Sequence, residues 1–154
     1  MKLIAHRGNT KGPQPNLENH PSYLMDALDK GFDVELDVWW WKDRFYLGHD
    51  KPQWELQTLE ILKNSKSWCH AKNEMALQML LKEECHCFWH QADDRVLTSL
   101  KYIWTYPGKK LIGDKTVCVV NEKIVSREEF MILKKNCVAI CSDYVDTLKK
   151  YEVE

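Results

Sequence analysis

Three short stretches near the start of the chain carry side chains that can bind a phosphate and move protons: His-Arg-Gly at 6–8, Glu-Leu-Asp at 35–37 and Gly-His-Asp at 48–50. An imidazole whose pKa lies near neutrality can act as a general acid or as a general base. Carboxylates can hold a divalent metal ion that polarises a phosphoryl oxygen. Together these residues suit metal-assisted chemistry on a phosphodiester.

Glu35 and Asp37 stand two residues apart in an apolar run that has the pattern of a β-strand. Side chains alternate along a strand, so both carboxylates point to one face while Val34, Leu36 and Val38 point to the other. Oxygen ligands of this kind suit Mg²⁺, Mn²⁺ or Ca²⁺. A Glu-x-Asp pair is also typical of a solvated strand face. The neighbouring histidines favour the metal site.

The two histidines are expected to converge on these carboxylates. Residues 39–49 have the pattern of a strand end, a turn at Lys42-Asp43 and a short return strand, which would bring His49 back beside Glu35 and Asp37. His6 ends the first apolar run, which lies next to the second in the simplest topology. We therefore expect His6 and His49 to flank a metal-bound phosphate as an acid/base pair.

Short β-type runs recur along the chain, and most of them end in polar or charged residues. In open α/β sheets and barrels, sites form at the C-terminal ends of parallel strands. The repetition therefore predicts a site at one end of a sheet. The runs are 2–5, 32–40, 67–71, 86–89, 102–106, 116–120 and 138–141.

Amphipathic helices alternate with these runs, which indicates an α/β fold. The first helix is expected to begin at Asn19-Pro21 and to stop at Gly31. A capping box at 126–129 opens the last predicted helix. The remaining predicted helices lie at 56–62 and 75–80.

The length limits the architecture. An eight-fold barrel usually needs about 250 residues, and a chain of 154 residues cannot supply eight full units. Residues 102–116 lack a helical pattern, so this crossover is expected to be a loop or a single turn. We predict a single domain over residues 1–154: a reduced TIM-type (β/α) barrel with some helices missing or shortened, and a small β-hairpin after the second strand.

Charge and composition narrow the range of partners. The chain has 22 Lys and Arg against 23 Asp and Glu, so no net field would attract nucleic acid and any phosphate recognition must be local. No apolar run is long enough for a membrane span or a signal peptide. We expect a soluble, cytoplasmic protein without stable membrane insertion, and the oligomeric state stays open.

Cysteine and tryptophan are the unusual parts of the composition. The 6 cysteines lie mostly in apolar, strand-like runs, as buried thiols do in a reducing compartment. The 7 tryptophans, densest at 39–41, serve either as packing mass for a small core or as a hydrophobic surface for a substrate.

The order of the motifs resembles the glycerophosphodiester phosphodiesterases, TIM-barrel enzymes related to phosphatidylinositol-specific phospholipase C and to the spider-venom phospholipase D toxins. The likeness is specific over residues 4–50, where His-Arg-Gly precedes Glu18-Asn19, then Gly-Phe-Asp-Val-Glu-Leu-Asp-Val, then a hairpin into Gly-His-Asp. It resumes at 56–62, at Ala71-Lys72 and at 139–144. The resemblance implies a phosphoric diester hydrolase of lipid metabolism acting on a glycerophosphodiester or a similar small diester.

The resemblance also implies roles for individual residues. His6 and His49 would be the catalytic pair, with water or a neighbouring substrate hydroxyl as the nucleophile. In the second case a cyclic phosphate forms first. The other residues fall into three groups: Arg7 and Lys72 on the phosphate, Glu35 and Asp37 on Mg²⁺ or Ca²⁺, and Glu18 and Asp50 as supporting residues.

This sequence departs from the family pattern in two places. His70 stands two residues before Lys72, where the family places a third acidic metal ligand. An imidazole favours Mn²⁺ or Zn²⁺ over Ca²⁺ and leaves the site one negative charge short. The long family insertion after the hairpin, which shapes the substrate pocket, is also missing, so the choice of substrate stays open.

Two alternatives compete with this interpretation. One is a protein that binds a phosphate ligand on the same fold without efficient catalysis. The other concerns residues 69–70, 85–87 and 90, a Cys/His set that superficially suits zinc, although its spacings are unusual. Otherwise Cys69 and Cys87 are core, and His70, His86 and His90 lie near the barrel mouth. The residues expected to line the substrate pocket are His90, Gln91, Trp104, Tyr106 and Glu122.

Overall fold

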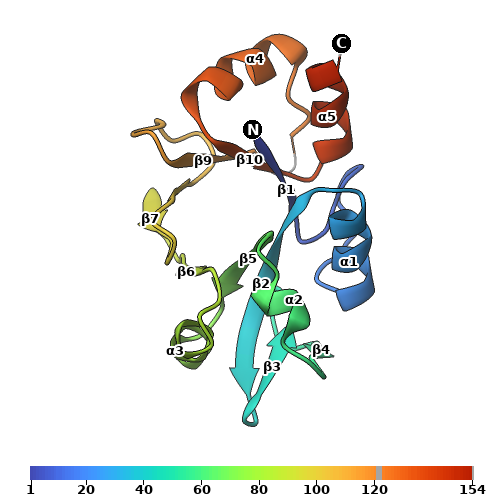
Figure 1. Ribbon diagram of the computed structural model, residues 1–154, viewed down its shortest axis with the longest axis vertical. Coiled ribbons are helices and arrows are strands. Elements are labelled where there is room, and N and C mark those ends of the chain that lie inside the picture. The colour runs from blue at the N-terminus through green and yellow to red at the C-terminus, as the bar shows by residue number, and fades with distance from the viewer. Residues whose placement is uncertain (121–122, 154) are drawn as a thin grey trace.

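A strongly curved sheet forms the centre of the molecule, and β1 (Lys2–His6) lies in its middle between β2 (Asp33–Trp41) and β10 (Ala139–Ser142). The computed structural model describes residues 1–120 and 123–153. Figure 1 shows the strands at the centre and the helices on the outside of the curve. The remaining strands are β3 (Arg44–Leu47), β4 (Trp54–Glu55), β5 (Ser67–Ala71), β6 (Cys87–Trp89), β7 (Arg95–Leu97), β8 (Ile103–Thr105) and β9 (Thr116–Val119).

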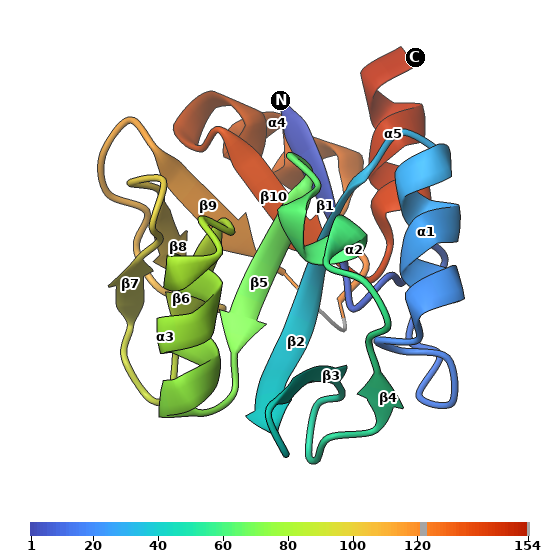
Figure 2. The same ribbon diagram turned by 60° about the horizontal axis from the view of Figure 1, so that its bottom comes forward.

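The described strands pair in both orientations. Parallel pairs join β6 to β5, β5 to β2, β2 to β1, β1 to β10, β10 to β9 and β9 to β8. Antiparallel pairs add β3 and β4 beyond β2, and β7 beyond β8. In Figure 2 the neighbouring strands β10, β1, β2 and β5 form the middle of the curved sheet.

The predicted reduced TIM-type barrel is wrong. The sheet is a curled half-barrel whose path runs from β4 to β7, with β5 and β6 branching from β2. Within the described residues β6 and β7 do not pair as strands, so the curved sheet stays open between them. The reason lies in the short connection between them: β7 runs antiparallel to β8, where a closed barrel would need a parallel strand with its own crossover.

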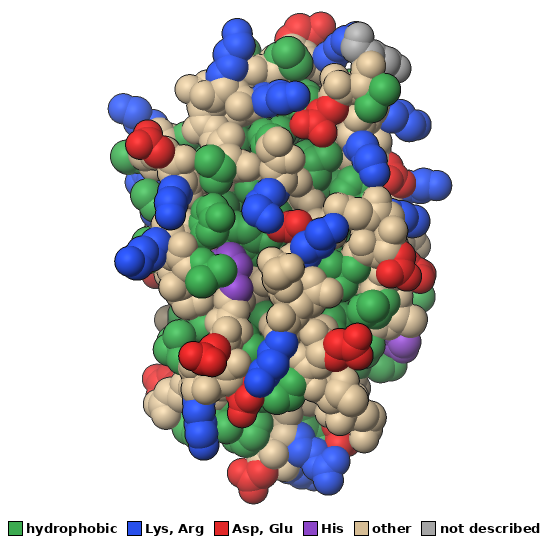
Figure 3. Space-filling model, viewed as in Figure 1, with side chains coloured by type: hydrophobic (Ala, Val, Ile, Leu, Met, Phe, Trp, Pro, Cys, Tyr) green, Lys and Arg blue, Asp and Glu red, His purple; other side chains and the backbone are tan. Residues whose placement is uncertain are grey.

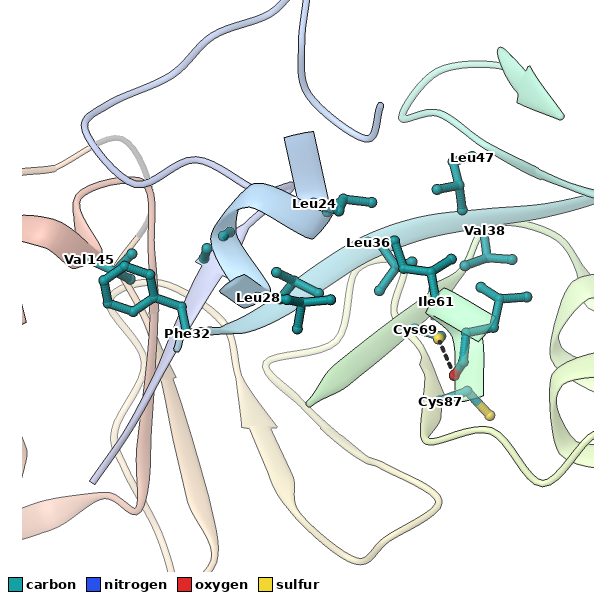
Figure 4. Close-up of a cluster of buried hydrophobic side chains, with 14 of the residues drawn as sticks. Leu24, Leu28, Phe32, Leu36, Val38, Leu47, Ile61, Cys69, Cys87 and Val145 are labelled. Atoms are coloured by element: carbon teal, nitrogen blue, oxygen red, sulfur yellow. Dashed lines mark hydrogen bonds between the residues drawn. The ribbon is translucent and has the colours of Figure 1, made fainter. Parts of the chain in front are cut away.

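Alternation along the strands separates two cores. Val34, Leu36 and Val38 point outward under the helices, as predicted, and Leu24 and Leu28 of α1 pack over them (Figure 4). The inner face holds a second apolar cluster: Ile4, Trp68, Phe88, Trp104, Val117, Val119, Ala139 and Cys141. Trp68 and Trp104 fill the curve of the sheet, which supports the packing interpretation for two of the tryptophans.

Five helices cover the outer face in the described part of the chain: α1 (Pro21–Asp29), α2 (Glu60–Lys63), α3 (Glu74–Lys82), α4 (Arg127–Asn136) and α5 (Val145–Val153). The N-cap half of the predicted capping box of α4 is confirmed, because the Ser126 side chain accepts from the backbone N–H of Glu129. The Glu129 carboxylate accepts from Lys123 and does not complete the box. The helix expected over 56–62 begins only at Glu60, because the backbone N–H of Leu56 still donates to Phe45 of β3 at 2.9 Å. Neither α5 nor β7 was predicted.

The predicted hairpin after β2 is present. Lys42 and Asp43 both have positive φ, as a type I′ turn requires, and Val38 to Trp41 pair with Arg44 to Leu47. The predicted absence of a helix between β8 and β9 is also confirmed. The strand run expected to reach residue 120 ends at Val119. Glu122, expected in the pocket, lies outside the described residues.

The surface carries no large region of one sign on the face shown in Figure 3, where basic and acidic side chains alternate. No helix among the described residues is both long enough and apolar enough to cross a bilayer. The expected burial of the cysteines is confirmed: all are free thiols, five are buried and Cys137 is half-buried.

Gly48 fixes the turn that carries His49, which leads to a first prediction. Its φ is +152°, and a Cβ at this position would lie 2.1 Å from the carbonyl oxygen of Lys51. Gly31 has a φ of +91° and no atom within 4 Å of such a Cβ, so it is a matched control for the backbone strain alone. Gly31→Ala should cost about 1 kcal/mol of unfolding free energy, and Gly48→Ala should cost clearly more. Urea unfolding of both variants measures the difference, and equal losses would contradict it.

Candidate functional site

A pocket of about 200 Å³ opens where the C-terminal ends of the inner strands meet. Most of the residues predicted to do chemistry line it, although they come from strands far apart in the sequence. Glu18 and Asp50 do not line it but contact residues that do. The lining residues are His6, Arg7, Glu35, Asp37, His49, His70, Lys72, His90, Gln91, Trp104, Tyr106, Pro107 and Val119.

Asp37 lies at the centre of the polar wall and is fully buried. Its Oδ2 accepts from Asn19 Nδ2 at 2.8 Å and lies 3.3 Å from Arg7 Nε. Its Oδ1 lies 3.1 Å from His70 Nδ1 and 3.6 Å from Lys72 Nζ. Burial alone would raise the pKa of Asp37, but the hydrogen bond with His70 and the charges of Arg7 and Lys72 hold it well below its usual range.

Glu35 extends the acidic wall toward β1. Its Oε2 accepts from the backbone N–H of Arg7 at 3.2 Å and lies 4.0 Å from His6 Nε2. Its Oε1 lies 3.6 Å from His70 Nδ1. Glu35 and Asp37 are thus both directed to the inner face, as the alternation in the sequence predicts, and both face His70.

His70 is held on two sides. Its ring stacks on Phe88 at 5.0 Å, and its Nε2 lies 3.1 Å from the carbonyl oxygen of His90. A carbonyl can only accept, so Nε2 carries a proton and Nδ1 faces the two carboxylates. Burial lowers the pKa of His70, but the hydrogen bonds to Asp37 and Glu35 outweigh it and raise the pKa to about 9.

The donor set fits a divalent metal. One ligand atom from each of Glu35, Asp37 and His70 lies within 4.8 Å of the others. The His90 carbonyl orients His70 in the way that outer-shell partners orient metal-binding imidazoles. Four ionised carboxylates and the two cations Arg7 and Lys72 leave the site with a net charge of −2. Either a divalent ion or two protonated imidazoles would neutralise this charge. These carboxylates are Glu18, Glu35, Asp37 and Asp143.

His6 is positioned by a residue that sequence reasoning missed. Its Nδ1 lies 2.8 Å from Oδ1 of Asp143, which directly follows β10. Because the carboxylate can only accept, Nδ1 carries the proton and Nε2 is free to exchange a proton with a ligand. Burial lowers the pKa of His6, but the bond to Asp143 and the charge of Glu35 raise it above its ordinary value.

Arg7 and Lys72 supply the positive wall of the pocket. Arg7 has a φ of +52°, and its side chain is held by Glu18 Oε2 at 3.2 Å and by Asp37. Lys72 follows β5 directly, and its backbone N–H donates to Val38 at 2.8 Å. Both cations therefore lie beside the acidic wall, where a bound phosphate would meet them.

His49 is at the rim of the pocket. The backbone N–H of Gly48 donates to the backbone carbonyl of Asp37 at 3.1 Å, and Trp39 Nε1 donates to the carbonyl of Gly48 at 2.7 Å, so the hairpin holds this turn against β2. The His49 side chain is 43% exposed, and its Nδ1 lies 2.7 Å from Oδ1 of Asp50. His49 thus shares the pocket with His6 but is more exposed.

Aromatic side chains beside His70 form another wall of the pocket. His90 stacks on Tyr106 at 4.8 Å, and Trp104 stacks on Phe88 at 4.5 Å. Gln91 adds an exposed amide beside them. Burial and the neighbouring His70 lower the pKa of His90. The expected pocket residues within the described chain therefore line one surface.

The structure does not assemble the alternative Cys/His zinc site. Among the described residues, Glu35, Asp37 and His70 form the only group of three or more potential ligands. The expectation that His86 lies near the pocket mouth is wrong. His86 begins the run into β6 at the opposite end of the sheet, where it contacts Trp68 and Thr98, and burial together with Lys2 lowers its pKa to about 4.

Three residues of the site were not predicted as such. Asp143 holds His6, and its place at a strand end is the signal that could have identified it. Asn19, expected to begin α1, instead exchanges two hydrogen bonds of 2.8 Å with Asp37, and His20 caps the helix. Asn9 is fully buried between Glu18 and Asp143. No pattern in the sequence singles it out.

Comparisons with protein-family models, with curated proteins and with solved structures find no match for this chain. The likeness to the glycerophosphodiester phosphodiesterases therefore depends on the motifs themselves.

The raised pKa of His70 predicts how stability depends on pH. A group whose pKa rises from 6.5 to about 9 on folding stabilises the protein fully below pH 6.5, and this contribution is lost as the pH rises through about 9. In metal-free buffer, His70→Gln should therefore cost about 3 kcal/mol more at pH 6 than at pH 9.5. Urea unfolding of both proteins across this range measures it. A difference that does not change with pH would contradict the prediction.

Proposed function

We propose that this chain is a metal-dependent phosphodiesterase that hydrolyses a glycerophosphodiester or a similar small phosphodiester. The observation that carries the proposal is that one pocket is lined by the imidazoles of His6 and His49, by two cationic side chains and by a Glu/Asp/His group. A site that only bound a phosphate would need the cations but not an acid/base pair. The volume of about 200 Å³ suits a small diester.

His6 is placed to transfer one of the two protons that the reaction requires. Asp143 holds the ring through Nδ1, so that Nε2 is the nitrogen that gives or takes the proton. His49, at the rim, transfers the other. Attack on the phosphorus by water or by a neighbouring substrate hydroxyl needs a base, and departure of the alkoxide needs an acid. The two histidines, which both line the pocket, fill these roles.

Arg7 and Lys72 would neutralise the negative charge of the bound phosphate. The guanidinium suits two phosphate oxygens at once, and the ammonium acts as a point charge on the developing oxyanion. Glu18 and Asp37 hold Arg7 in place before a ligand binds, so little side-chain freedom is lost on binding. Glu35, Asp37 and His70 would hold Mg²⁺, Ca²⁺ or Mn²⁺, which when bound neutralises a phosphoryl oxygen.

A second candidate function is binding of a phosphate ligand without efficient turnover. The contacts of Asp37 favour it: this carboxylate already meets Arg7, Lys72, Asn19 and His70, and a protonated His70 can replace a metal ion. A phosphate would still find both cations. A cytoplasmic location and the lack of a nucleic-acid partner, both expected from the sequence, are compatible with either candidate function.

His6→Ala and His49→Ala should each lower the rate of diester hydrolysis about 10²- to 10⁴-fold, because each removes a proton-transfer step. Hydrolysis of glycerophosphocholine and of a chromogenic diester measures the loss, and ³¹P NMR shows whether a cyclic phosphate precedes the product. His20→Asn is the matched control, since asparagine keeps the cap of α1 and His20 lies outside the pocket. Near-normal hydrolysis by either alanine variant would rule out its assigned role.

A metal titration separates the two candidate functions. Mg²⁺, Ca²⁺ and Mn²⁺ are added in turn to metal-free protein, and both binding and hydrolysis are followed. The phosphodiesterase should gain activity with at least one metal, and Glu35→Gln should lose that gain. Binding of inorganic phosphate without hydrolysis under every metal would favour the second candidate instead.

A further inference from the structure

We propose that Asn9 is a positioning residue that holds the acid/base histidine His6 and the phosphate-binding Arg7 in one fixed arrangement, an inference that rests on the function proposed above. Asn9 touches neither the pocket nor a ligand site directly. It acts through the two carboxylates that hold the two working side chains.

The contacts of the Asn9 amide nitrogen define this role. Nδ2 donates to Oδ1 of Asp143 at 2.7 Å and to Oε1 of Glu18 at 2.8 Å. Asp143 uses the same oxygen to hold His6 Nδ1, and Glu18 uses its other oxygen to hold Arg7. One amide group therefore joins two chains of contacts, one ending at His6 and the other at Arg7.

The orientation of the amide is determined by its surroundings. Both neighbours of Nδ2 are carboxylates, which accept, so only the NH₂ end of the amide can face them. The opposite end, Oδ1, accepts from Tyr23 Oη and from the backbone N–H of Gln14, each at 3.2 Å. Asn9 itself is 0% exposed. An amide with donors and acceptors matched on both sides and no access to water has one stable position.

Asn9 also reduces the repulsion between two neighbouring carboxylates, which an apolar side chain at this position would not do. Asp143 is buried and Glu18 is half-buried, and a shared donor between them reduces their mutual repulsion. Without the amide, each carboxylate can rotate away from the other and take its partner along. The distance that matters is small, because a displacement of about 1 Å at a reacting group can cost about 10²-fold in rate.

The test uses Asn9→Leu in the full chain, a change that keeps the number and branching of the side-chain heavy atoms and removes both N–H donors together with the Oδ1 acceptor. Outer-shell partners of this kind typically contribute about 10- to 100-fold. We expect kcat to fall and KM to rise by about tenfold each, because one contact chain ends at the proton-transfer group and the other at the phosphate. In a Glu18→Gln background, Asn9→Leu should still lower kcat but should not raise KM further.

Two readouts do not depend on turnover. The ¹⁵N spectrum of His6 reports which ring nitrogen carries the proton, and Asn9→Leu should reduce the preference for Nδ1. Calorimetry with inorganic phosphate reports the Arg7 side, and the affinity should fall about tenfold. Asn136→Leu is the matched control, because this exposed asparagine of α4 also donates its amide, to Ile132, and lies outside the pocket.

The outcomes separate this inference from the proposed function. If wild-type protein hydrolyses diesters and Asn9→Leu leaves the kinetics, the His6 spectrum and the phosphate affinity unchanged, the positioning role is overturned and the function stands. If wild-type protein hydrolyses nothing but the variant alters both readouts, the positioning stands and the function fails. Should Asn9→Leu not fold, Asn9→Ser, whose hydroxyl can serve only one carboxylate at a time, should show the same changes to a smaller extent.

Discussion

The burial of several carboxylates at one end of a curved sheet is the constraint on which the rest of this structure depends. A buried carboxylate without partners costs several kcal/mol of unfolding free energy, so each one must be matched by cations or donors. Asp37 alone meets an arginine, a lysine, a histidine and an asparagine. Strand ends, loop conformations and helix starts are all arranged to bring those partners in.

The loops around β1 show what this arrangement demands of the backbone. Arg7 and Asn19 both have positive φ, which is uncommon for residues other than glycine. In return, the backbone N–H of Arg7 reaches Glu35 and the side chain of Asn19 closes a pair of bonds with Asp37. Strained backbone is concentrated at functional sites when surrounding contacts over-determine it. Here the contacts are with Glu35 and Asp37, the carboxylates that the proposed chemistry uses.

The sequence predicts which residues come together in the pocket better than it predicts the fold. Alternation in β2 is enough to direct Glu35 and Asp37 to one face, and the C-terminal ends of parallel strands bring His6, His70 and Lys72 beside them. Closure of the sheet is different, because it depends on tilt and on the connection between two short strands that carry little pattern of their own. The barrel prediction failed at that point.

Other features were missed in the sequence, each for its own reason, and one of them, helix α5, could have been predicted. Helix α5 has apolar residues at 145, 148 and 151, so its helical spacing was visible in the sequence. Asp143 lies 137 residues from His6, and only the pairing of the first and last parallel strands brings them together. Asn9 and Asn19 owe their roles to loop conformations that no local pattern encodes. An asparagine before a proline predicts a helix cap, and the carboxylate of Asp37 offered a better partner.

Because the sheet is open between β6 and β7, the strands that carry the pocket residues differ in how many neighbouring strands they pair with. The charged wall comes from β1, β2 and β5, which pair with one another on both sides of β2, whereas His90 and Gln91 of the aromatic wall follow β6, which borders the open edge and has β5 as its one strand partner among the described residues. Across this edge Ser99 supplies one of several bridges, through its bonds to Cys87. Strands with few neighbours exchange their amide protons sooner and rearrange at lower cost. On the function proposed above, His6, Arg7, Asp37 and Lys72 are therefore anchored to the well-paired side of the sheet, and the residues that follow β6 lie on the side that rearranges at lower cost.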